Sequence, residues 1–146
     1  MGISLKVVNQ REFESRLKGQ SVNTTNNVIK TINKIANNVR NTAVTSILQN
    51  PRAGGLSTRY NPKRSIRISK AGDPPASDTG FLAGQIVLKI DADGLGASVI
   101  SNANYSEALE FGTLTMPARP FMQPAVEENR RKYEKELSKA IRDGIK

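Results

Sequence analysis

Two segments of the chain repeat apolar residues at intervals of three or four, the spacing that brings side chains to one face of a helix. In residues 23–49 the repeat runs from Val28 to Ile47, and residues 121–142 carry a narrower repeat with mixed charges on the other face. The first segment is otherwise rich in Asn and Thr, which are poor helix formers. We therefore predict two long amphipathic helices, the first of which depends on burying its apolar face.

Shorter segments alternate apolar and polar residues, as half-buried strands do. Residues 3–8, 85–90 and 96–101 show this alternation, and Asp91-Ala92-Asp93-Gly94 lies between the last two with residues that favour turns. We predict that the last two segments form an antiparallel hairpin. The side chains expected to face inward are Ile86, Leu88, Ile90, Ala97 and Val99.

Three short helices are also predicted, each behind a polar residue that can accept hydrogen bonds from the first free amides. They are residues 10–18 after Asn9, a turn through Phe81 and Leu82 after Asp78 or Thr79, and a segment through Tyr105 and Phe111 after Asn104.

Two irregular segments separate these elements. Residues 50–80 are interrupted by glycine and proline and carry the densest basic cluster, in which residues 65–69 alternate enough for an edge strand or one arm of a long hairpin. Residues 110–125 contain three prolines and Gly112, which exclude a continuous helix or a central strand, yet they also hold five large apolar side chains. Such a segment must pack against its own subunit or another one, either as a stiff connector or as a contact surface.

These elements predict a single domain over residues 1–146, of the α+β class. A small antiparallel sheet of about three to four strands is expected to combine the N-terminal strand, the basic segment and the 85–101 hairpin. The two long helices are expected to pack on this sheet, with the basic segment as an extended loop or hairpin. Because the apolar face of the C-terminal helix is narrow, that helix could also project from the body.

The net charge of +9 is concentrated in the first half of the chain. Residues 1–70 contain thirteen Lys and Arg against two acids, whereas residues 71–146 contain nine against eleven. A field of one sign favours a polyanionic partner, first nucleic acid and second an acidic protein surface, although a basic face can also simply be solvated. The side chains expected to face DNA or an acidic partner are Arg52, Arg59, Lys63, Arg64, Arg67 and Lys70.

The chain contains neither cysteine nor histidine. This excludes disulfides and thiolate metal sites, and it removes the commonest general base and the usual transition-metal ligand. The acids are capping residues or partners of Lys on helix surfaces, and no serine lies in a nucleophile turn. We therefore expect no catalysis, no cofactor and no metal. No stretch approaches the roughly 20 apolar residues of a membrane span, and the first residues lack a signal-peptide block, so no membrane partner is expected.

Two segments resemble a known protein family. Residues 69–82, Ser-Lys-Ala-Gly-Asp-Pro-Pro-Ala-Ser-Asp-Thr-Gly-Phe-Leu, are similar to the Gly-x-Pro-Pro-Ala-x-x-Thr-Gly-x-Leu segment of tail-completion or head-tail joining proteins of tailed double-stranded DNA bacteriophages. Residues 105–125 resemble the same family's Tyr-x-x-x-x-Glu-Phe-Gly-Thr, followed by Met-Pro-Ala-Arg-Pro-Phe-x-x-Pro-Ala. The two segments keep the family's order, with the predicted hairpin between them. Lys70-Ala71 departs from the usual Ala-Pro pair, so the resemblance does not extend to the path of that loop.

The resemblance implies a non-enzymatic neck or tail component of the virion, assembled in the host cytoplasm as a homo-oligomeric ring of six or twelve copies around the DNA channel. Its implied partners are a connector or head-closure protein, a tail-terminator or tail-tube protein, and double-stranded DNA contacted through its backbone. We expect Glu110 and Arg119 to pair across a subunit contact and to set its register. The residues expected at that contact are Glu110, Phe111, Gly112, Met116, Arg119 and Phe121.

The alternative is a small basic nucleic-acid-binding protein that contacts the duplex backbone. It predicts tight binding with a steep salt dependence from the isolated protein, whereas a joining protein can bind free DNA only weakly.

Overall fold

The computed structural model describes residues 2–5, 22–51, 53–60 and 62–144, and within them the fold is α+β, as predicted. The predicted helix at 10–18, the end of the first predicted strand and Arg52 lie outside the described residues. The elements are β1 (Gly2–Leu5), α2 (Val22–Leu48), β2 (Leu56–Tyr60), β3 (Lys63–Arg67), α3 (Phe81–Gly84), β4 (Ile86–Ile90), β5 (Ala97–Ser101), α4 (Ser106–Phe111) and α5 (Met122–Gly144).

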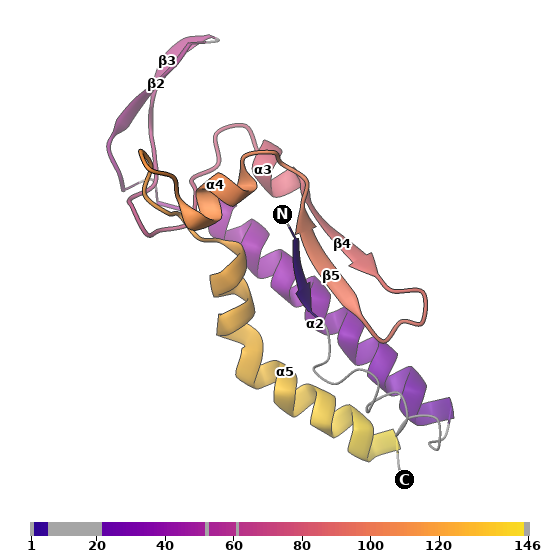
Figure 1. The fold of residues 1–146 in the computed structure, drawn as a ribbon. Helices are drawn as coiled ribbons and strands as arrows, with labels where there is room; N and C mark the ends of the chain where they lie inside the picture. Colours follow the sequence, from indigo (N-terminus) through magenta and orange to yellow (C-terminus); the bar gives the residue numbers. More distant parts are fainter. Residues whose placement is uncertain (1, 6–21, 52, 61, 145–146) are drawn as a thin grey trace.

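The long helices α2 and α5 lie side by side in opposite directions (Figure 1). At one end, a Cβ atom added to Gly144 would lie 2.4 Å from the Cα atom of Thr24, so only glycine allows this approach of the two backbones. Further along, Lys34 Nζ lies 3.2 Å from Glu136 Oε1. Because α5 packs along α2, the alternative in which the C-terminal helix projects from the body is wrong.

The main sheet has the strand order β1-β5-β4, and both pairs are antiparallel. The predicted hairpin is present, with Leu88 opposite Val99, and Val99 also stands opposite Ile3 of β1. Alternate residues of β5 are buried against the helices, as predicted. Ile90 differs from the prediction, because it is 44% exposed at the end of the edge strand β4, where a neighbouring strand flanks it on one side only.

The core lies where the inner face of the sheet meets α2 and α5. One apolar cluster joins Val39 and Ile47 of α2 to Val99 of β5 and to Phe121 and Met122 at the start of α5. The other is centred on Val28, Ile32 and Ala36 of α2 together with Ala97 of β5. Full burial of such side chains stabilises a fold by about 1.5 to 3 kcal/mol each, which explains how a helix rich in Asn and Thr persists.

The basic segment does not join the main sheet, so that part of the prediction is wrong. Strands β2 and β3 pair only with each other, and Figure 1 shows their hairpin reaching away from the body. At its base, Gly54 N donates to Ile68 O at 2.9 Å and Ile68 N donates to Gly55 O at 3.0 Å. Both faces of the hairpin carry polar or charged side chains, and the main sheet could not bury either face without removing these groups from water.

The short helices α3 and α4 follow the predicted positions but not the predicted caps. No side chain caps α4, whose N-cap residue is Tyr105, so the prediction of Asn104 is wrong. Gly80 precedes α3 in the left-handed region, with φ of 80°, and its amide donates to Ser77 Oγ at 3.0 Å. Thr79 Oγ1 accepts only a long bond of 3.4 Å from Phe81 N.

We expect Tyr133 to make the stability of the protein fall at high pH. Its ring is buried, its hydroxyl has no hydrogen-bond partner among the described residues, and burial raises the pKa of Tyr133 to about 12, with Glu136 and Glu128 adding to the rise. An unfolded tyrosine titrates near pH 10. Burial of the neutral Tyr133 side chain therefore contributes fully to the free energy of unfolding below about pH 10. This contribution is lost as the pH rises towards about 12.

Thermal melts of the wild type and of Tyr133→Phe over this pH range check the expectation. At neutral pH the variant should be at least as stable as the wild type, because it removes a buried hydroxyl that has no described partner. The difference in its favour should grow above about pH 10. Tyr60→Phe, at an 80% exposed position, is the control and should not change the pH profile. Parallel profiles for all three proteins would contradict the expectation.

Candidate assembly surface

The segment between α4 and α5 is held by the carboxylate of Glu110. Its Oε2 atom accepts hydrogen bonds from the amides of Phe121 at 2.9 Å and Met122 at 3.0 Å, and its Oε1 atom accepts one from Gln123 at 2.8 Å. The next residue is Pro124, which has no amide hydrogen. All four backbone positions that a helix start normally leaves without partners are thus accounted for, and a negative charge lies at the positive end of the helix dipole.

Glu110 and Phe121 are therefore interior residues, which corrects their predicted place on a subunit contact. Glu110 is only 4% exposed and Phe121 only 1%, and both lie within one chain. The apolar stretch that suggested a contact surface is in part core, because Phe121 and Met122 belong to the same buried cluster as residues of α2 and of the sheet. The notion of a stiff connector describes these two residues better.

The loop that follows α4 presents apolar side chains to solvent. Gly112 has φ of 76°, and a Cβ atom there would lie 2.8 Å from Met116 O, so glycine is required at this turn. Thr113 N donates to Met116 O at 2.8 Å, which closes a tight turn around Leu114. Leu114 is fully exposed at its tip, and Phe111 is 67% exposed beside it.

Arg119 joins this loop to the base of the basic hairpin. Its Nη1 atom donates to Ser69 O at 2.8 Å and to Ser69 Oγ at 2.7 Å, and Ser69 is buried. A backbone bond from Gly72 N to Ala118 O, 3.0 Å long, lies alongside. The expected pairing of Glu110 with Arg119 across a contact is wrong, because each side chain has its partners elsewhere in its own chain.

A groove of about 610 Å³ opens where these segments meet. Its lining combines residues from the two segments that carry the family resemblance, 69–82 and 105–125, with residues from the hairpin and the end of α2. The apolar part of the lining is Ile47, Ile68, Pro75, Leu82, Leu109 and Met116, and the polar part includes Ser57, Arg59, Asp78 and Arg119.

Two exposed aromatic rings stand on the rim of this groove. The rings of Phe81 and Tyr105 have centroids 6.3 Å apart and are tilted by 32° to each other. Burial raises the pKa of Tyr105, and the positive charge of Arg59 partly opposes that rise. The phenol therefore stays neutral at physiological pH, so the rim offers uncharged aromatic surface.

The basic residues of the hairpin divide into two groups. Arg59 and Arg64 stand opposite each other on the strands and share one carboxylate, that of Asp78. Arg64 Nη2 lies 2.9 Å from both oxygens of Asp78, and Arg59 Nε lies 3.7 Å from Oδ2. This pair of contacts holds the hairpin against residues 74–80. Lys63, Arg67 and Lys70 are exposed, and no ion pair to a described residue neutralises them.

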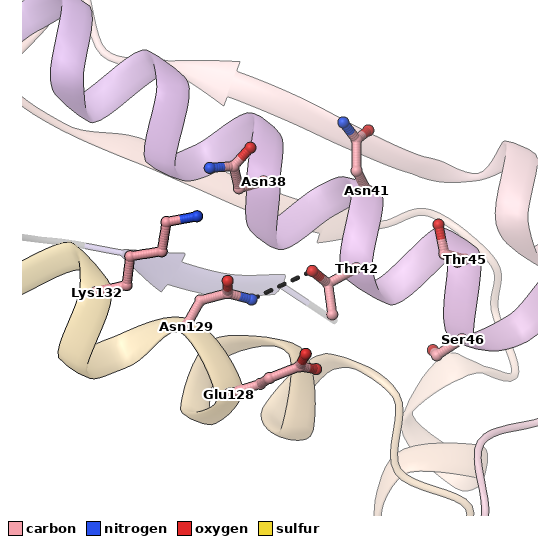
Figure 2. Close-up of a pocket in the computed structure, with 8 residues that line it drawn as sticks. All are labelled: Asn38, Asn41, Thr42, Thr45, Ser46, Glu128, Asn129 and Lys132. Carbon is pink, nitrogen blue, oxygen red and sulfur yellow. Dashed lines mark hydrogen bonds between the residues drawn. The ribbon is translucent and has the colours of Figure 1, made fainter.

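A second groove lies between α2 and α5, and its lining residues are all polar or charged (Figure 2). Its volume is about 500 Å³, and Asn129 Nδ2 crosses it to donate to Thr42 Oγ1 at 3.2 Å. The remaining lining consists of amides, hydroxyls, Glu128 and Lys132 (Figure 2). Four residues that weaken the intrinsic helix propensity of α2, namely Asn38, Asn41, Thr42 and Thr45, thus line this groove between α2 and α5.

Comparisons of the chain with models of protein families, with curated proteins and with solved structures gave no match. In the described part of the chain, no helix is long and apolar enough to cross a membrane. The same residues contain no group of three or more acidic side chains arranged to hold a metal ion.

Sequence reasoning missed Ser69 and Asp78 as the residues that hold the hairpin. Both lie in residues 69–82, directly after the basic cluster. An acid such as Asp78 so close to many basic residues was a usable signal for an ion pair. Neither partner could be named, however, because Arg119 is fifty residues from Ser69 in the chain and the two meet only in the folded structure.

We expect Glu110→Ala to destabilise the protein by about 3 kcal/mol, because it leaves buried amides at the start of α5 without an acceptor. Glu110→Gln retains one acceptor oxygen and should cost about half as much. Chemical denaturation followed by circular dichroism measures both changes. The matched control is Glu107→Ala on the same short helix, which removes an exposed acid and should have little effect. Equal losses at the two positions would contradict the capping role.

We expect Asp78→Asn to release the hairpin while leaving the core intact. The three side chains are partly exposed, so the loss of global stability should stay below about 1 kcal/mol. The amides of β2 and β3 should exchange hydrogen faster and the hairpin should be cleaved sooner by trypsin. Asp73→Asn, in the same loop but without an ion pair to a described residue, is the control. Unchanged exchange in Asp78→Asn would show that other contacts hold the hairpin.

Proposed function

We propose that this protein is a structural component of the neck or tail of a tailed double-stranded DNA bacteriophage. In this proposal it joins or completes the interface between head and tail as an oligomeric ring around the DNA channel, without catalysis. One observation carries the proposal. The two segments that resemble the joining-protein family are separated by the β4–β5 hairpin, yet they form one surface through the Arg119–Ser69 and Gly72–Ala118 contacts.

The exposed apolar residues on this surface support a contact with another protein. Phe81, Tyr105, Phe111 and Leu114 all lie in or directly beside the two segments, and each is at least 40% exposed. Phe81 and Tyr105 stand on the rim of the groove, and Phe111 and Leu114 lie on the adjoining helix and turn. Exposed aromatic and aliphatic groups of this kind are typical of interaction sites. A ring subunit needs such a surface for its neighbours, and a neck component needs one for the connector or head-closure protein and for the tail-terminator or tail-tube protein.

The exposed basic residues support a position beside DNA. Lys63, Arg67 and Lys70 lie on or next to the hairpin and lack described ion-pair partners, so they can contact phosphates without reading bases. Arg59 and Arg64 support this role less, because Asp78 already neutralises part of their charge. The absence of histidine and cysteine from the sequence is consistent with a role that needs no catalysis.

A nonsense mutation in the gene, introduced into the phage or prophage that carries it, tests the proposal. We expect DNA-filled heads and separate tails that do not join, visible by electron microscopy, with joining restored by the wild-type gene supplied from a plasmid. Joined, infectious particles from the mutant would refute the proposal. If the isolated protein also bound duplex DNA tightly with a steep salt dependence, the result would favour the nucleic-acid-binding alternative.

A further inference from the structure

Helix α4 separates two different surfaces. Tyr105, Ala108 and Leu109 line the groove described above. At about 100° per residue, Glu107 and Phe111 lie 120° or more around α4 from Tyr105 and Leu109, whereas Phe111 follows Ala108 by one turn; Glu107 and Phe111 are exposed. Leu114 follows at the tip of the next turn. We call Glu107, Phe111 and Leu114 the knob.

The knob combines apolar bulk with one negative charge. Phe111 is four residues after Glu107, which places the two side chains next to each other along the helix. Glu107 has no hydrogen bond or ion pair with any described residue. Leu114 and Phe111 are the largest apolar groups here that nothing in the described chain covers. Large apolar anchors beside a charge are the usual composition of an interface centre and its edge.

The groove offers the complementary chemistry. Arg119 flanks its apolar lining. Of the three guanidinium nitrogens of Arg119, Nη1 alone has a partner among the described residues, which is Ser69. Its Nε atom is buried without one, and no described carboxylate pairs with this charge. A cation left unpaired in a partly buried position favours binding of an anion. The volume of about 610 Å³ lies in the range that accepts groups larger than one side chain.

We propose that the knob of one copy of this chain inserts into the groove of a second copy. Phe111 and Leu114 then pack between the apolar lining and the Phe81–Tyr105 rim, and Glu107 lies towards Arg119. The contact joins two different surfaces, so each subunit keeps a free knob and a free groove. Such head-to-tail contacts close into rings when the rotation between neighbours allows it. This inference rests on the proposed function, because it names the contact that builds the proposed ring.

Two variants test the knob and the groove independently. The double variant Phe111→Ser, Leu114→Ser removes the knob at exposed positions and should leave the fold intact. Ser57→Trp places a large ring in the groove from the hairpin, away from the knob, and Ala76→Trp does so from residues 69–82 if the first variant folds poorly. Val22→Ser is the control, because Val22 is an apolar residue, 76% exposed, at the end of α2 far from α4 (Figure 1).

Size-exclusion chromatography with light scattering gives the result. We expect the wild type and Val22→Ser to form the same oligomer, and the knob variant and the groove variant each to remain monomeric. An equimolar mixture of the two variants should form a dimer and nothing larger, because one intact knob meets one intact groove. Glu107→Lys should raise the dissociation constant by about tenfold, since it places two positive charges together.

Three outcomes would overturn the inference. The variants could retain the wild-type oligomer, the mixture could stay monomeric, or the wild type could be monomeric at every concentration. None of these would by itself refute the proposed function, which the nonsense mutant tests through the joining of heads to tails. Conversely, a mixture that dimerises together with a mutant phage that joins normally would establish the contact and refute the neck role.

Discussion

The arrangement of this protein depends on one buried carboxylate. Glu110 is at the end of α4, and its oxygens accept the free amides at the start of α5, so the two helices are held at a defined separation. The residues between them must then close a tight turn, which Gly112 allows and which the prolines stiffen. The path of the chain after this turn brings Arg119 within hydrogen-bonding distance of Ser69. The position of the knob and of the α4 side of the groove depends on that interaction of Glu110.

Part of the positive charge of the protein is neutralised by ion pairs within the chain. The chain is strongly basic in its first half, but the structure uses two of those arginines internally, around Asp78. Exposed ion pairs of this kind contribute little to global stability, yet they are enough to orient a hairpin that has no core of its own. In that half, Lys30 is exposed on α2, and the other exposed basic residues without an ion pair to a described residue, Lys63, Arg67 and Lys70, lie on or next to that hairpin. A phosphate backbone would meet them before it met the body of the protein.

The groove and the knob share one rigid framework, which has a consequence for assembly. Both are attached to α4, and the backbone around them is tied by Arg119 and by the cap at α5. A contact that joins them between copies would lose little conformational freedom on forming, so more of its apolar burial would appear as affinity. The hairpin, held only at its base and by Asp78, is the part that can adjust to other partners.

Local pattern in the sequence was sufficient for the α+β class, both long helices and the 85–101 hairpin, because the periods of apolar residues reflect which face of each element is buried. It was not sufficient for the basic hairpin, which the prediction placed in the main sheet, or for Glu110 and Phe121, which it placed on a surface. Those positions depend on partners many residues away: the amides at the start of α5 for Glu110, and the buried residues of α2 and the sheet for Phe121. A sequence shows that a residue is apolar or charged, but only the tertiary structure decides whether its partner lies in the same chain.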